Sequence, residues 1–242
     1  MVTASRSYQR DPAGWQPLLS FPEYLSNRTR APLMAPVDLP QRLTEVTGPV
    51  HGERPLGRLD NDLTRQHDGD PHGQRIIVHG RLVDGDGRPV PASLIEVWQA
   101  NSSGRYRHDH DQWSAPLDPN FDGVGRALTD AQGRFEFVTV KPGAYPWRNT
   151  HNAWRPAHIH FSVFGCAFTQ RLVTQMYFPD DPLLPADPIF NSIPDERARR
   201  MIVSRFDPER TVPEWALAFE FDMVLRGTSP TPFENDQDED QA

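Results

Sequence analysis

The sequence contains a single cysteine, Cys166, among 242 residues, so no disulfide can form within one chain. A lone cysteine of this kind is usually a small buried hydrophobic residue, and its presence fits a reducing cytoplasm. No apolar run approaches the roughly 20 residues of a membrane-spanning helix. The first residues also lack the apolar stretch of a secretory signal peptide. We therefore expect a cytoplasmic protein that does not bind membranes.

Positive charge is also scarce. Lysine and arginine number 25 against 33 aspartate and glutamate residues, which gives a formal net charge of −8. Affinity for a phosphate backbone depends on lysine and arginine, so this balance argues against nucleic acid as a partner. Part of the acidic excess lies in residues 234–242, and we expect residues 236–242 to form a disordered acidic tail.

Long helical patterns and glycine-rich nucleotide-binding motifs are missing as well. Proline is abundant instead, with 25 residues, and because it breaks helices it excludes an architecture of long helices. Residues 1–71 show little periodicity. They are expected to form a loop-rich N-terminal arm that wraps the core, with one short helix near residues 39–46.

Short strand patterns separated by turns begin at Arg75. Residues 75–83 and 92–98 flank the turn 84–89 and are predicted to form a hairpin. A second hairpin is predicted around the turn 130–133, between residues 126–129 and 134–140. Further strands are expected at 157–163, 170–178 and 216–225, with a helix capped by Ser192 and Asp195 that runs to about Ser204. This pattern predicts an all-β fold, a β-sandwich core over residues 72–235 with few short helices.

The segment RPAHIHFSV at residues 155–163 carries a histidine pair. Successive side chains of a strand alternate between its faces, so His158 and His160 point to one side. Ile159, Phe161 and Val163 then point to the other side, toward a hydrophobic core. Two imidazoles about 7 Å apart on one face can converge on one metal ion. The pair alone is weak support for a metal site, since most such histidines are exposed or hydrogen-bonded.

Two of the five tyrosines strengthen the case for a metal. Tyr106 lies in GRYRH and Tyr145 in KPGAYPW, which are turn-like segments rather than regular core positions, and loops often carry functional groups. Phenolate is a hard anionic donor that suits ferric iron. A bound cation also lowers the tyrosine pKa below its free value of about 10. Two imidazoles and two phenolates would favour Fe(III) over Zn(II), and over the Fe(II) of sites with two histidines and one carboxylate.

Several motifs together resemble the intradiol ring-cleaving dioxygenases. They are VWQAN at 97–101, GRYRH at 104–108, APLDPNF at 115–121, KPGAYPWRN at 141–149 and WRPAHIHF at 154–161. The resemblance runs from about Trp15 to Asn235 and is greatest to the beta chains of the branch that acts on protocatechuate, which LRG at 225–227 and FEN at 233–235 also resemble.

The resemblance implies a mononuclear non-haem Fe(III) as cofactor. Its four protein ligands would be Tyr106, Tyr145, His158 and His160. The reaction implied is cleavage of protocatechuate by O2 to 3-carboxy-cis,cis-muconate, in the beta-ketoadipate pathway of aromatic-compound catabolism. Tyr145 would leave the iron and accept a substrate proton, and Arg155 would stabilise negative charge during ring attack.

The resemblance also implies a substrate pocket and a protein partner. Gln175 would line the pocket with a catalytic role, Trp147 and Ile189 would form apolar walls, and Tyr24 would reach the substrate from the N-terminal arm. The partner would be an alpha subunit of related fold, around which the arm also wraps, in a hetero-oligomer of alpha–beta protomers. Positive charge for the substrate carboxylate could then come from the alpha chain, despite the acidic balance here.

Each of these residues also has a structural interpretation. Arg155 could be a surface ion-pair partner, and Gln175, Ile189 and Tyr24 could be packing residues. His108 and His110 follow Tyr106 in a polar loop and are expected to be exposed. Two alternative functions stay open: a catechol or hydroxyquinol 1,2-dioxygenase, whose N-terminal helical segment is not evident here, and a non-catalytic β-sandwich binding module.

Overall fold

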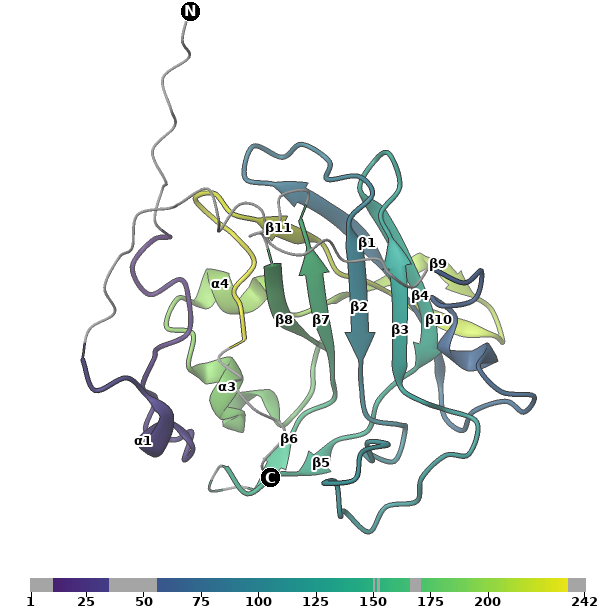
Figure 1. Ribbon diagram of the computed structural model, residues 1–242, viewed down its shortest axis with the longest axis horizontal. Helices are drawn as coiled ribbons and strands as arrows, with labels where there is room; N and C mark the ends of the chain where they lie inside the picture. Colours follow the sequence, from purple (N-terminus) through teal and green to yellow (C-terminus); the bar gives the residue numbers. More distant parts are fainter. Residues whose placement is uncertain (1–10, 35–55, 150, 152, 166–170, 235–242) are drawn as a thin grey trace, which may run out of the picture.

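The computed structural model describes residues 11–34, 56–149, 151, 153–165 and 171–234. Two β-sheets pack face to face (Figure 1). The larger sheet contains β1 (Arg75–Asp84), β4 (Arg134–Val140), β9 (Arg205–Val212), β10 (Ala216–Glu220) and β11 (Met223–Leu225). The second sheet runs in the order β3 (Val124–Leu128), β2 (Leu94–Trp98), β7 (His158–Phe164) and β8 (Arg171–Tyr177). The predicted all-β sandwich is confirmed.

The remaining elements are short. They are α1 (Asn27–Arg30), η1 (Leu63–Arg65), β5 (Tyr145–Pro146), β6 (Trp154–Arg155), η2 (Leu184–Ala186), α3 (Pro188–Asn191) and α4 (Glu196–Met201). The described parts of the N-terminal arm are mainly irregular, as predicted. The helix expected near residues 39–46, the tail 236–242 and Cys166 lie outside the described residues. No helix in the described part of the chain has the length and apolar character needed to cross a membrane.

The central strand is β1, which pairs antiparallel with β4 on one side and parallel with β10 and then β11 on the other. Its partner changes from β10 to β11 near Gly80. A Cβ atom at Gly80 would lie 1.9 Å from the carbonyl oxygen of Phe221, so the close approach of the two backbones requires glycine there. The continuous strand predicted over 216–225 is therefore two strands, separated at Phe221 and Asp222.

Aromatic rings fill the space between the sheets. Phe161 of β7 lies 6.1 Å from Phe135 and 6.2 Å from Phe137 of β4, measured between ring centroids. Ile159, Phe161 and Val163 all belong to this core, whereas the two histidines of β7 point to the opposite face of the sheet. The predicted alternation along β7 is confirmed. Burial of the apolar face fixes the register of β7 and with it the position of both imidazoles.

Both predicted hairpins are wrong, although both turns form. Asp84 accepts hydrogen bonds from the backbone N–H groups of residues 86 and 88, and Asp130 accepts them from residues 132 and 134. Each turn carries the chain from one sheet to the other, because β1 and β4 lie in the larger sheet and β2 and β3 in the second. Pro89 and Pro91 follow the first turn, and proline cannot donate to a strand ladder. After β3, the Thr129 backbone N–H donates to the Ser93 carbonyl, which extends the pairing of β3 with β2.

The helix predicted after Ser192 is shorter than expected. Its N-cap is Asp195, whose side chain accepts a hydrogen bond from the backbone N–H of Arg197, and α4 ends at Met201. Ser192 instead ends the preceding helix, α3. Strand β9 was not predicted, because its sequence RFDPERTV is mostly exposed and contains a proline. It is an edge strand, where proline is tolerated.

Candidate metal centre

Both histidines of β7 are buried on the outer face of the second sheet. Their ring centroids lie 4.9 Å apart, with the rings nearly perpendicular. The neighbouring strands bring Trp98 and Gln175 opposite His160, and Tyr177 opposite His158. The His-x-His pair therefore forms the floor of a site that loops and short helices cover.

The two tyrosines enter this site from loops that contact each other. Gly104, at φ 76°, lies so close to the backbone of Ala144 that a Cβ atom would stand 2.1 Å from the Ala144 carbonyl oxygen. This close approach places the Tyr106 and Tyr145 rings edge to face, with centroids 5.3 Å apart. The hydroxyl oxygen of Tyr106 lies 3.2 Å from His160 Nε2, and that of Tyr145 lies 3.3 Å from His158 Nε2.

The outward nitrogens of both imidazoles have partners of their own. His158 Nδ1 lies 2.7 Å from the carbonyl oxygen of Pro156, and His160 Nδ1 lies 3.1 Å from Glu234 Oε2. A proton on each Nδ1 leaves the Nε2 lone pairs directed at the tyrosine oxygens. Burial, followed by the charges of Arg155 and His160, lowers the pKa of His158 well below its ordinary value. His158 is therefore neutral, as a metal ligand must be.

The four convergent atoms are two imidazole nitrogens and two phenol oxygens. Among the described residues, no group of three or more histidine, cysteine, aspartate and glutamate side chains could hold a metal ion. A metal at this position would thus depend on the tyrosines. Such a nitrogen and hard-oxygen donor set fits ferric iron. The structure brings together all four residues predicted as ligands.

Arg155 of β6 lies beside this cluster and is 1% exposed. Its Nε donates to Asp187 Oδ1 over 2.8 Å, and its Nη2 donates to Gln175 Oε1 and to the Tyr177 hydroxyl. The interpretation of Arg155 as a surface ion-pair residue is excluded by this burial. The buried guanidinium therefore places a positive charge next to the four convergent atoms.

Tyr177 completes the network around Arg155. Its hydroxyl oxygen lies 2.8 Å from Asp187 Oδ2. Burial and the Asp187 charge raise the Tyr177 pKa well above its usual range, so this tyrosine remains a neutral hydrogen-bond donor. Gln175 Nε2 is buried without a hydrogen-bond partner among the described residues. It is a donor available to a bound molecule.

Among the other predicted pocket residues, Trp147 contacts Arg155. The Trp147 ring lies 5.1 Å from the Arg155 guanidinium carbon, and the Tyr24 ring packs 5.3 Å from Trp147. Ile189 of α3 is buried, two residues after Asp187. His108 and His110 are exposed, as predicted.

Four residues of the site were not predicted from the sequence: Trp98, Tyr177, Asp187 and Glu234. Trp98 stacks on His160 at 4.7 Å with an interplanar angle of 7°. The period-two rule could have found Tyr177, because it lies two residues after Gln175 on the same strand face. Asp187 precedes a proline and caps α3, which is a common helix-start signal. Nothing in the sequence indicated the contact between Glu234 and His160.

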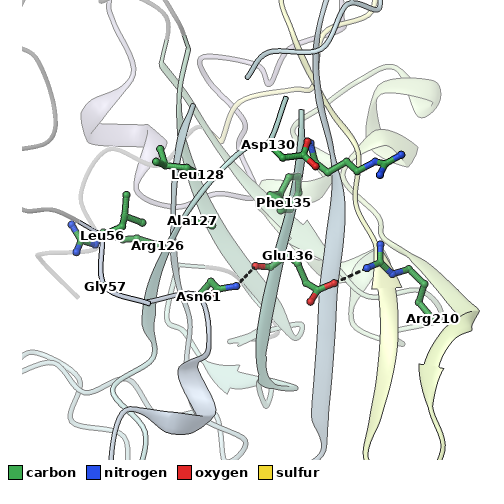
Figure 2. A pocket seen from close by; sticks show the side chains of 11 residues that line it. Leu56, Gly57, Asn61, Arg126, Ala127, Leu128, Asp130, Phe135, Glu136 and Arg210 are labelled. Atoms are coloured by element: carbon green, nitrogen blue, oxygen red, sulfur yellow. Dashed lines mark hydrogen bonds and ion pairs between the residues drawn. The ribbon is translucent and has the colours of Figure 1, made fainter. Parts of the chain in front are cut away.

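A surface cavity of about 500 Å³ lies elsewhere, along the edge formed by β3 and β4 (Figure 2). Figure 2 shows Arg210 paired with Glu136, and Asn61 donating to the Glu136 carbonyl oxygen. The ion pair has an N–O distance of 2.6 Å. Arg126, which also lines the cavity, pairs with Asp60. None of the predicted site residues lines this cavity, and β3 lies at the opposite edge of its sheet from β8.

Comparison with known proteins identifies the family of this chain. Residues 46–227 match a family model described as dioxygenase, and residues 8–42 match the protocatechuate 3,4-dioxygenase beta subunit N terminal. The chain therefore belongs to the dioxygenase family, and its resemblance to the intradiol enzymes is confirmed. It is 53% identical over 227 residues to the protocatechuate 3,4-dioxygenase beta chain of Burkholderia cepacia. The aligned region covers 92% of this chain and 96% of the Burkholderia chain.

More distant similarities extend to an alpha chain and to a solved structure. The protocatechuate 3,4-dioxygenase alpha chain of Pseudomonas putida is 30% identical over 166 residues, covering 68% of this chain and 77% of that one. The structure of 3-chlorocatechol 1,2-dioxygenase from Rhodococcus opacus 1CP aligns with a TM-score of 0.54 at 22% identity. The aligned region covers 69% of this chain and 65% of the Rhodococcus chain. This similarity shows a shared fold.

Proposed function

We propose that this chain is the iron-bearing beta subunit of an enzyme that cleaves protocatechuate. O2 would open the ring between its two hydroxyl-bearing carbons to give 3-carboxy-cis,cis-muconate. The observation that carries the proposal is the convergence of Tyr106, Tyr145, His158 and His160 beside the buried Arg155. The similarity to a protocatechuate 3,4-dioxygenase beta chain supports the choice of substrate.

The four convergent residues would hold Fe(III). The bound ion would supply a chelation point for the two adjacent hydroxyls of the substrate, and would thereby make the ring reactive toward O2. His158 and His160 serve as neutral nitrogen ligands. Tyr106 and Tyr145 serve as phenolates, whose negative charge matches a trivalent cation.

Each remaining residue has a role on the substrate side. Tyr145 Oη accepts a proton from a substrate hydroxyl, as a general base. The Arg155 guanidinium stabilises the negative charge that develops on the ring. Gln175 Nε2, which has no hydrogen-bond partner among the described residues, donates to the bound substrate.

Apolar and aromatic side chains shape the rest of the pocket. Trp147 and Ile189 form walls that exclude water, and Tyr24 supports Trp147 from the N-terminal arm. A low local dielectric strengthens the interaction of Arg155 with the reacting ring.

The partner would be an alpha chain of related fold. Similarity of this beta-type chain to the Pseudomonas putida alpha chain supports such an alpha–beta protomer. The alpha chain would complete the pocket and supply positive charge for the ring carboxylate, which the net charge of −8 on this chain does not provide.

The test is to co-express the chain with an alpha chain and to measure iron content, visible absorption and O2 uptake. Phenolate-to-Fe(III) charge transfer should colour the protein burgundy, and uptake should be fastest with protocatechuate. His160→Ala should abolish iron retention. The control is His72→Ala, which replaces an exposed histidine and should leave iron retention unchanged. A colourless protein without iron would contradict the proposal, and faster uptake with catechol would favour a catechol 1,2-dioxygenase.

A further inference from the structure

The two proposed histidine ligands are held in different ways. His158 Nδ1 contacts the backbone carbonyl of Pro156, two residues earlier in the chain. His160 Nδ1 contacts the carboxylate of Glu234, which lies 3.1 Å away and 74 residues later. The first contact follows from the local backbone, whereas the second requires the C-terminal segment to lie beside β7 and β8.

The C-terminal segment, residues 230–234, is anchored to the rest of the fold at several points. The Glu234 backbone N–H donates to the Val173 carbonyl over 2.9 Å, and the Thr174 hydroxyl donates to the Pro232 carbonyl over 2.7 Å. Trp15 Nε1 donates to the Pro230 carbonyl over 2.6 Å. Figure 1 shows this segment in yellow, running from β11 down the side of β8. These bonds bring the Glu234 side chain to the buried edge of His160.

The Glu234 side chain is 5% exposed and that of His160 is 0% exposed. A buried carboxylate is costly unless it has a partner, so this contact is specific. Trp98 fixes the plane of the imidazole by stacking on it. Glu234 fixes rotation within that plane, because it accepts the Nδ1 proton and thereby keeps the Nε2 lone pair on the side of Tyr106.

We propose that Glu234 is a positioning residue for the ligand His160, so that the C-terminal segment forms part of the iron site; this inference rests on the proposed function. A carboxylate that accepts the second N–H of a ligand imidazole fixes its tautomer and raises its basicity. Its removal should weaken metal binding about 10–100-fold.

The test compares iron-loaded alpha–beta enzymes that carry Glu234→Gln, Glu234→Asp or Glu209→Gln. Glu209 is exposed on β9 in the other sheet, so it provides the same chemical change away from the site. Iron release to excess chelator is followed by the loss of charge-transfer absorption. Glu234→Gln should release iron about 10–100-fold faster than wild type with a shifted absorption maximum. Glu234→Asp should recover part of the loss, and Glu209→Gln should match wild type.

Thermal unfolding of the metal-free proteins separates positioning from general stability. If Glu234 acts by positioning His160, the metal-free Glu234→Gln protein should unfold close to the wild-type temperature. Wild-type iron release and an unchanged spectrum in folded Glu234→Gln would overturn the proposal. If Glu234→Gln does not fold, the same result in folded Glu234→Ala, which also lacks the carboxylate, would overturn it. A wild-type enzyme that binds no ferric iron would instead refute the proposed function and this inference with it.

Discussion

Arg155 and Asp187 form an ion pair that solvent does not reach, with Arg155 Nε 2.8 Å from Asp187 Oδ1. Asp187 also accepts the backbone N–H of Phe190 and so caps α3, the helix that carries Ile189. One carboxylate therefore links the proposed charge-stabilising arginine to the proposed apolar wall. Displacement of either element would displace the other.

Arg155→Met should destabilise the protein by about 3–5 kcal/mol, because it leaves the Asp187 charge buried without its cation. Arg155→Met combined with Asp187→Asn should regain most of this stability, since asparagine retains the helix cap without the charge. Both proteins should keep their iron and lose turnover by several orders of magnitude, because the guanidinium serves the reacting complex. Urea unfolding, metal analysis and O2 uptake measure the three effects. Near-normal turnover in either protein would make the role of Arg155 structural.

The two tyrosines should respond differently to phenylalanine. Tyr145→Phe should still bind iron through the other three proposed ligands, with a shifted colour. Its binding of protocatechuate should be slower, because Tyr145 is proposed to leave the iron and accept a substrate proton. Tyr106→Phe removes the ligand that is proposed to stay on the iron, so its damage should fall on iron affinity and every later step. Anaerobic stopped-flow absorbance with each iron-loaded variant distinguishes them. Equal chelation rates in Tyr145→Phe and wild type would argue against a departing ligand.

Gly104→Ala should disturb the proposed iron site without replacing a proposed ligand. The new Cβ would lie 2.1 Å from the Ala144 carbonyl oxygen, so the Tyr106 and Tyr145 loops must separate. Gly87→Ala is the matched control, because Gly87 has nearly the same φ, 78° against 76°, and nothing within 4 Å of its Cβ position. Both should lose about 1–2 kcal/mol of stability from the left-handed backbone, but only Gly104→Ala should change the charge-transfer spectrum. Identical spectra would show that the loop contact does not set the tyrosine geometry.

The cap of α4 predicts a pH-dependent stability. Hydrogen bonds from the Arg197 side chain and backbone lower the pKa of Asp195 from 3.8 to about 2. Because the Asp195 pKa is lower in the folded than in the unfolded protein, the ionised carboxylate stabilises the fold at pH values above about 3.8. This stabilisation is lost as the pH falls from about 3.8 toward 2. Asp195→Asn should therefore lower the urea midpoint at pH 6 and lower it less at pH 3. A difference that does not shrink at pH 3 would mean that the Asp195 charge is not its source.

Local sequence patterns predicted the strands better than their partners. The alternation in β7 was predicted because burial of Ile159 and Phe161 against the core determines it. The turns at Asp84 and Asp130 were also predicted, since their chemistry is local. The sheet on which each following strand lies was not, because it depends on pairings such as β1 with β10, which are distant in the sequence.

In the candidate site, too, local motifs were predicted from the sequence and contacts between distant segments were not. Tyr106 and Tyr145 were found because their loop segments carry recognisable motifs, although only the structure places them next to His158 and His160. Asp187 and Glu234 were missed as site residues. Their roles arise from contacts made across the fold, and an isolated Asp-Pro or Phe-Glu pair has no periodicity that would reveal such a contact.

The pairing of β1 has a consequence for how the chain acquires its fold. Ile76 pairs with Leu217 and Val83 with Val224, so one side of the central strand remains unpaired until most of the chain has been synthesised. Closing such long loops costs chain entropy before any contact compensates for it, and parallel pairings of this kind form slowly. Until then β1 exposes an apolar, hydrogen-bonding edge, which is a template for aggregation. Production at low temperature or with chaperones should therefore raise the soluble yield.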